Sequence, residues 1–132
     1  MARARIPVEE GVDAVRAVRA GADDRVTVAT AVRYLLQVLG EVAPGNSVEV
    51  RVPPFGAVQA VEGPRHTRGT PPNVVETDPA TWVALATGDL DWDGALGAAR
   101  VSASGRRATL REWLPLPWAR MDGGTRRPRC GS

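Results

Sequence analysis

The chain has 132 residues, the size of one domain that can bury a substantial core. Its 17 basic residues, all arginine, nearly balance 15 acidic ones, for a net charge of +2. Arginine forks suit phosphate, but no basic stripe with interleaved aromatic residues occurs, which argues against nucleic-acid binding. A single cysteine, Cys130, excludes an internal disulfide, and there is no long apolar run. We therefore expect a cytoplasmic protein.

Two helices are predicted in the N-terminal third, after a loose basic arm over residues 1–5. The first runs from about Pro7 to Ala20, because proline suits a first turn and Gly21 suits a helix end. Asp24 is a good N-cap for the second. The apolar residues that follow recur at helical spacing: Val28, Val32, Leu35, Leu36, Leu39 and Val42.

Three short strands are predicted next. Residues 47–52 alternate between apolar and polar side chains, the pattern of a strand with one buried face. Residues 57–61 form a second strand, which the short "PPFG" link makes antiparallel to the first. Residues 73–77 form the third.

The second half of the chain predicts two helices, a strand and a last helical turn. Asp78 caps a helix that begins at Pro79 and ends at Gly88, and Asp91 caps a shorter one. A brief strand covers 101–105. A last helical turn over 110–114 stops at Pro115, and residues 117–132 lack periodicity and are predicted to be disordered.

This order of elements predicts an α+β fold, with one small, mostly antiparallel sheet and helices packed on one face. Ordinary catalytic constellations are absent from the sequence: no nucleotide-binding or serine-hydrolase motif occurs, and one histidine with one tail cysteine argues against a Cys/His pair. No enzyme activity and no cofactor are expected.

A partial match to a calcium-binding loop occurs in "DLDWDG", residues 89–94. Asp89, Asp91 and Asp93 fit its first half, but the position that needs a bidentate glutamate is Arg100. A cation at that position would repel calcium. We therefore expect Asp91 to cap a helix and no metal to bind.

The segment "EGPRHTRGTPPN", residues 62–73, holds the one histidine of the chain. Prolines and glycines constrain it, and Arg65, His66 and Arg68 give it a dense positive charge. One hypothesis is that these three side chains form a clamp for a carboxylate or phosphate. The alternative is that the arginines are solvated or paired with nearby glutamates, while His66 binds a backbone carbonyl.

Residues 46–92, "NSVEVRVPPFGAVQAVEGPRHTRGTPPNVVETDPATWVALATGDLDW", resemble the bacterial orthologues of sterol carrier proteins, and "VSASGRRATLREWLPL" continues the likeness. The resemblance covers roughly residues 25–116, so residues 1–24 form an added arm and helix and 117–132 a tail. The positions that match the general sterol-carrier pattern are Asp78, Gly88, Leu90, Ala95, Val101 and Gly105.

The resemblance implies about five strands, helices on one face and an apolar tunnel between the layers. It also implies non-catalytic binding of a lipid, such as a fatty acyl chain, a sterol-like molecule or an isoprenoid. Ten apolar residues are the predicted lining, with ordinary core packing as the alternative for each: Val28, Val32, Leu35, Leu39, Trp82, Leu85, Trp92, Leu96, Leu110 and Trp113.

Lipid transfer of this kind needs no nucleotide. Burial of an acyl chain yields about 0.8 kcal/mol per methylene in a protein and a similar amount in a bilayer, so exchange during a transient membrane contact is nearly neutral. The competing hypothesis is a ligand-free interaction or accessory module, which binds a protein partner through an exposed sheet edge or the arginine-rich tail. The sequence leaves the ligand and the oligomeric state open.

The clamp hypothesis predicts that Arg65→Ala combined with Arg68→Ala weakens the binding of a fatty acid, because the carboxylate loses its charge-assisted hydrogen bonds. The affinity is measured by titration with a fluorescent fatty acid. An unchanged affinity would show that the loop is not a clamp.

Overall fold

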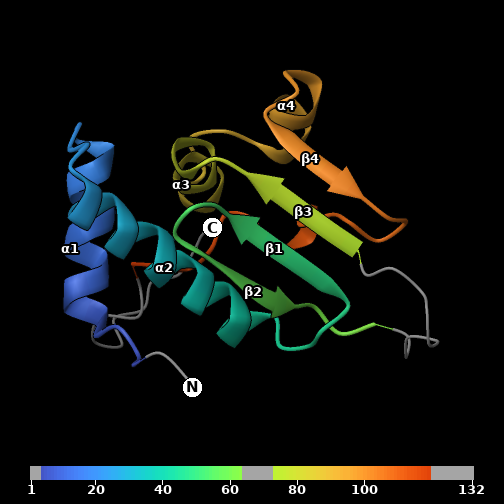
Figure 1. The fold of residues 1–132 in the computed structure, drawn as a ribbon, viewed down its shortest axis with the longest axis horizontal. Helices are drawn as coiled ribbons and strands as arrows, with labels where there is room; N and C mark the ends of the chain where they lie inside the picture. The colour runs from blue at the N-terminus through green and yellow to red at the C-terminus, as the bar shows by residue number, and fades with distance from the viewer. Residues whose placement is uncertain (1–3, 64–72, 120–132) are drawn as a thin grey trace, which may run out of the picture.

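The computed structural model describes residues 4–63 and 73–119 and confirms the predicted α+β class (Figure 1). The N-terminal half contains two helices and two strands: α1 (Val8–Arg19), α2 (Arg25–Val42), β1 (Val48–Val52) and β2 (Gly56–Ala60). The remaining elements are β3 (Asn73–Thr77), α3 (Pro79–Thr87), α4 (Trp92–Gly97), β4 (Val101–Ser104) and a 3₁₀ turn, η1 (Arg111–Trp113).

The helices α2 and α3 begin where the sequence predicts, because short acidic side chains satisfy their first free amides. Asp24 accepts a hydrogen bond from the Thr27 amide at 3.0 Å at the start of α2. Asp78 does the same for the Thr81 amide at 3.0 Å at the start of α3, with Pro79 in the first turn. These contacts confirm both predicted caps.

The sheet has the order β2-β1-β3-β4 among the described residues, which is one strand fewer than expected. β1 pairs antiparallel with β2, and β3 pairs antiparallel with β4. The central pair, β1 and β3, is parallel, with Val48 opposite Asn73. β2 and β3 therefore lie on opposite sides of β1 in the sheet.

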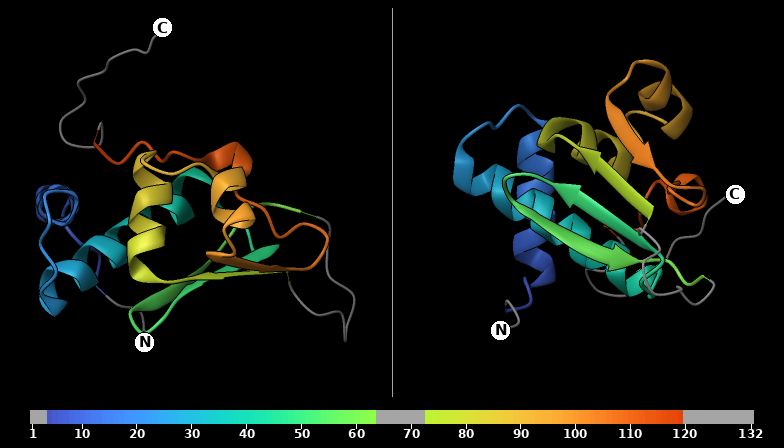
Figure 2. Two further views of the ribbon diagram at one scale, coloured as in Figure 1. Left: turned by 90° about the horizontal axis from the view of Figure 1, so that it is seen from above. Right: turned by 45° about the vertical axis from the view of Figure 1, so that its right-hand side comes forward.

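The helices gather on one face of this sheet, as Figure 2 shows in its view from above. β1 alternates clearly: Val48, Val50 and Val52 are fully buried, whereas Arg51 is exposed. β3 repeats the pattern, with Val75 buried and Glu76 exposed. One face of the sheet is thus the floor of the core and the other faces solvent.

The core forms where α2 and α3 meet the buried face of the sheet. Trp82 of α3 is completely buried, and its indole Nε1 donates a hydrogen bond to the Val32 carbonyl of α2 at 3.3 Å. This contact satisfies the polar atom of the largest buried side chain, which would otherwise be costly to bury. Leu35 and Leu39 of α2 and Leu85 of α3 complete the centre of the core.

α1 lies against α2 on the side away from the strands (Figure 1). The two helices approach closely at Gly11, since a Cβ atom built there would lie only 2.2 Å from ring carbons of Tyr34. The Tyr34 side chain is itself completely buried, so its ring has little room to move away. Gly11 is therefore a packing requirement at this position.

We predict that Gly11→Ala destabilises the fold by about 1–3 kcal/mol, the usual range for overpacking a filled interior. The free energy of unfolding is measured by urea denaturation. Gly97→Ala in α4 is the matched control, because a Cβ there meets nothing within 4 Å. Its effect should be neutral or slightly stabilising. Equal stability of Gly11→Ala and the unmodified chain would contradict the described helix contact.

Candidate functional site

A cavity of about 250 Å³ lies where the end of α3, the start of α4 and the segment around η1 meet. Its wall is more apolar than polar and comes from three separate parts of the chain. The apolar lining residues are Leu85, Leu90, Trp92, Leu114 and Pro115. Leu85 and Trp92 are almost completely buried, so this cavity reaches from the surface into the core.

The break between α3 and α4 creates the space for the cavity. α3 ends at Gly88, which takes the left-handed conformation with φ of 90°. A side chain there would be strained, and its Cβ would lie 3.3 Å from Pro115. Three residues later Asp91 caps the next helix, α4, by accepting a hydrogen bond from the Gly94 amide at 2.6 Å. The two helix ends leave a gap that side chains fill incompletely.

The segment that follows η1 closes this gap from outside. The Leu116 amide donates to the Ala86 carbonyl of α3 at 2.8 Å, and the Trp118 carbonyl accepts a hydrogen bond from the Tyr34 hydroxyl at 2.9 Å. Between residue 110 and these two contacts, Trp113 and Leu114 are only half-buried. This wall is therefore attached at its ends and has no strand pairing along its length.

Charged residues stand at the mouth of the cavity. Arg111 of η1 pairs with Asp93 of α4, and both side chains are well exposed. The pair connects the outer wall of the cavity to α4. Because it is exposed, its contribution to stability is small, and it can break and form readily.

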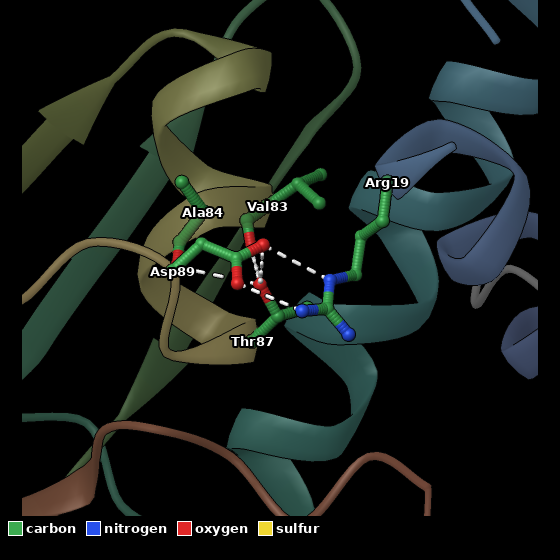
Figure 3. Close-up of polar contacts among 5 residues, drawn as sticks. All are labelled: Arg19, Val83, Ala84, Thr87 and Asp89. Carbon is green, nitrogen blue, oxygen red and sulfur yellow. Dashed lines mark hydrogen bonds and ion pairs between the residues drawn. The ribbon is translucent and has the colours of Figure 1, made fainter. Parts of the chain in front are cut away.

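A second ion pair holds Asp89, which lies between the lining residues Gly88 and Leu90 (Figure 3). Arg19 at the end of α1 donates through Nε and Nη2 to the two carboxylate oxygens of Asp89, at 2.9 and 2.7 Å. The Thr87 hydroxyl also contacts Asp89, at 3.2 Å. The hydrogen bonds from Arg19 are the main cause of the lowered pKa of Asp89.

Arg19 also connects α1 with the C-terminal part of the described chain. Its guanidinium carbon lies 5.9 Å from the ring centroid of Trp118, a cation–π distance. One side chain of α1 thus reaches both the α3–α4 connection and the segment that covers the cavity.

The predicted lining residues are found mostly in the core. Among the ten, Val28 and Trp113 are half-buried and Leu96 is 40% exposed, and the others are buried. Two of the ten, Leu85 and Trp92, line this cavity. Leu90, Leu114 and Pro115 were not predicted as lining, and the irregular, apolar "LPLP" stretch was the signal that could have suggested two of them. The clamp residues Arg65, His66 and Arg68 lie outside the described residues.

The aspartates of "DLDWDG" each have a partner within the protein. Asp91 caps α4, as predicted, while Asp89 pairs with Arg19 and Asp93 with Arg111. Within the described part of the chain, no group of three or more His, Cys, Asp or Glu side chains could hold a metal ion. The arrangement offers an apolar space with a charged rim.

An α+β domain with helices on one face of a small mixed sheet is consistent with a sterol-carrier-like fold. The family described as "bacterial SCP ortholog" matches residues 24–116. The chain therefore belongs to this family of bacterial orthologues of sterol carrier protein. A search of curated proteins finds no match.

The matched region begins at the N-cap of α2 and ends next to the cavity wall, so α1 lies before it. Over residues 4–63 and 73–119, no helix has both the length and the apolar character needed to cross a membrane.

The ion pair of Figure 3 predicts a pH-dependent contribution to stability. The folded-state pKa of Asp89 is lowered, so the contribution is present above the unfolded-state value of about 3.9 and is lost as the pH falls through the folded value. Asp89→Asn should therefore lower the melting temperature at pH 7, with a difference from the unmodified chain that closes in acid.

The comparison is made by thermal unfolding between pH 7 and strongly acidic pH. Glu112→Gln is the control, because Glu112 is exposed and has no hydrogen-bond or ion-pair partner among the described residues. A difference between Asp89→Asn and the unmodified chain that does not depend on pH would contradict the role of the charge.

Proposed function

We propose that this protein binds a lipid without chemically changing it and transfers it between apolar environments. The observation that carries the proposal is the apolar cavity at the α3–α4 junction of a chain that belongs to the sterol carrier family. Apolar walls with a few polar groups at the entrance are typical of sites for amphipathic ligands. The ligand class is a fatty acyl chain, a sterol-like molecule or an isoprenoid.

The size of the cavity limits how such a ligand can enter. Pockets for small molecules usually measure about 300–1,000 Å³, and this cavity measures about 250 Å³. It therefore holds part of a lipid, and the rest requires a wall to move. The segment over 111–115 is the most suitable wall, since its side chains are half-buried or exposed and it belongs to no strand.

The polarity of the cavity supports a lipid better than that of another hollow on the molecule. A space of about 330 Å³ lies beside the ends of β3 and β4, and its lining includes Glu76, Asp78 and Arg100. An acyl chain there would desolvate charged groups, which is unfavourable. In the α3–α4 cavity the charged lining residues are exposed: Asp93 pairs with Arg111, and Asp91 caps α4.

Of the ten predicted lining residues, Leu85 and Trp92 are proposed as direct ligand contacts, together with Leu90 and Leu114. The other buried members of the ten are proposed to form the surrounding core: Val32, Leu35, Leu39, Trp82 and Leu110. A longer ligand would reach them only after the cavity had widened. Leu96, with 40% of its surface exposed, is not part of this proposed site.

A ligand-free interaction module is the second candidate, and the sheet edges favour it. β4 lies at one edge, and its residues 102–104 are exposed. A partner strand could pair with such an edge. Native mass spectrometry of freshly purified protein separates the candidates: a co-purifying lipid supports the carrier, whereas a lipid-free dimer or complex supports the module.

We predict that Leu114→Trp, which fills the cavity, weakens the binding of a fatty acid at least about tenfold. This factor corresponds to the loss of roughly two buried methylenes at 0.8 kcal/mol each. Isothermal titration calorimetry measures the affinity. Leu96→Trp is the matched control, since the same substitution at an exposed site of α4 should leave the affinity unchanged.

A lipid-free mass together with no saturable uptake of a fluorescent acyl probe by the unmodified chain would reject the carrier function. Equal affinities of the Leu114→Trp and Leu96→Trp variants would instead place the ligand elsewhere in the protein.

A further inference from the structure

A second pocket, of about 230 Å³, lies between the residues that precede α1, the middle of α2 and the turn between β1 and β2. It shares no lining residue with the cavity at the α3–α4 junction. Its apolar surface comes from Ile6, Leu36, Phe55 and Val58, and its polar groups come from Arg33 and Gln37. It therefore combines an apolar wall with a positive charge.

Two arginines of α2 lie near the ring of Phe55, and one of them, Arg33, lines the pocket. The guanidinium carbons of Arg25 and Arg33 lie 5.3 and 6.0 Å from the ring centroid of Phe55. Arg33 also donates through Nε to the Phe55 carbonyl at 2.9 Å. The ring and this hydrogen bond hold the Arg33 guanidinium at the pocket, so its position is fixed before any ligand arrives.

Neither arginine has an acidic partner among the described residues. The four ion pairs found there involve Arg5, Arg19, Arg51 and Arg111. Asp24 is next to Arg25 in the sequence, but its carboxylate accepts hydrogen bonds from Thr27.

Arg33 uses only Nε in the hydrogen bonds of the described region, which leaves its two terminal nitrogens as donors. A bound anion could accept hydrogen bonds from these terminal nitrogens, and the charge of Arg25 near the same ring would add to the attraction.

The opposite wall of the pocket is also fixed. The Gln37 side chain donates to the Ile6 carbonyl at 3.0 Å and accepts from the Ile6 amide at 2.9 Å. These paired hydrogen bonds attach the chain before α1 to the middle of α2. The apolar side of the pocket is thus preformed next to the guanidinium groups, which reduces the ordering cost of binding.

We propose that this pocket binds an oxyanion carried on a short apolar chain, either a carboxylate or a phosphate monoester. The oxyanion would receive hydrogen bonds from Arg33 and charge stabilisation from Arg25, since arginine suits both anions. The chain would lie against Leu36 and Val58. The site is independent of the proposed lipid cavity, so each can be tested without the other.

The test is an NMR titration of the full chain with hexyl phosphate, hexanoate, inorganic phosphate and hexanol. We expect saturable shifts of the amides around Phe55 with the first two compounds, and weaker binding of inorganic phosphate and hexanol. Comparison of hexyl phosphate with hexanoate identifies the preferred anion.

Arg33→Gln should weaken hexyl phosphate binding at least about tenfold, because Arg33 donates hydrogen bonds to the oxyanion. Arg25→Gln should weaken it about threefold, because Arg25 contributes its charge without a hydrogen bond. Arg51→Gln is the matched control, because Arg51 lies on the solvent-facing side of β1 and should leave the affinity unchanged.

Arg25 is exposed and Arg25→Gln is expected to fold, which keeps the test valid if Arg33→Gln proves unstable. Three results would overturn the proposal: equal affinity for hexanol and hexyl phosphate, equal affinity for inorganic and hexyl phosphate, or no effect of either the Arg25 or the Arg33 substitution. A loss of hexyl phosphate binding that leaves fatty-acid binding intact would confirm that the two sites are separate.

Discussion

Burial of one face of β1 is the constraint on which the rest of the structure depends. Val48, Val50 and Val52 can leave water only if α2 and α3 cover that face of the sheet, and apolar burial is the main favourable term in folding. Trp82 of α3 is then completely buried and donates its indole NH to the Val32 carbonyl of α2. The alternation along β1 thus determines which side of the sheet carries the helices and which side faces solvent.

The centre of this arrangement is a cluster of buried side chains, whereas a cavity lies at its border. Where α2 crosses the sheet, aliphatic side chains and Trp82 pack in one continuous cluster. At the α3–α4 junction one helix ends at Gly88 and the next begins after Asp91, and the covering segment has no regular strand or α-helix. Helix ends point few side chains into the space between them, so an apolar cavity remains there.

The local features of the fold could be predicted because they depend on short-range chemistry. Asp24, Asp78 and Asp91 cap helices through contacts only three residues away, and the alternation of residues 48–52 identifies the buried face of β1. The parallel pairing of β1 with β3 could not be predicted in the same way. An alternating pattern shows which face is buried, but it does not identify the neighbouring strand.

The candidate sites were harder to predict from the sequence, because local patterns do not identify tertiary neighbours. Helical periodicity correctly indicates that Val32 and Leu35 are buried, but it cannot show whether neighbouring side chains fill the space beside Leu85. The Arg19–Asp89 pair joins residues 70 positions apart, and the convergence of Arg25 and Arg33 on Phe55 depends on where the β1–β2 turn meets α2. Such contacts are consequences of the tertiary fold.

The stacking of Arg19 on Trp118 has a consequence for where the folding unit ends. Both residues lie outside the region 24–116 that matches the family, yet they meet across the molecule. A protein trimmed to the family limits would lose the Arg19 partner of Asp89, the Trp118 acceptor of the Tyr34 hydroxyl and the whole apolar cover that α1 lays over Tyr34. Residues on both sides of the stretch that matches the family therefore contribute contacts that stabilise it.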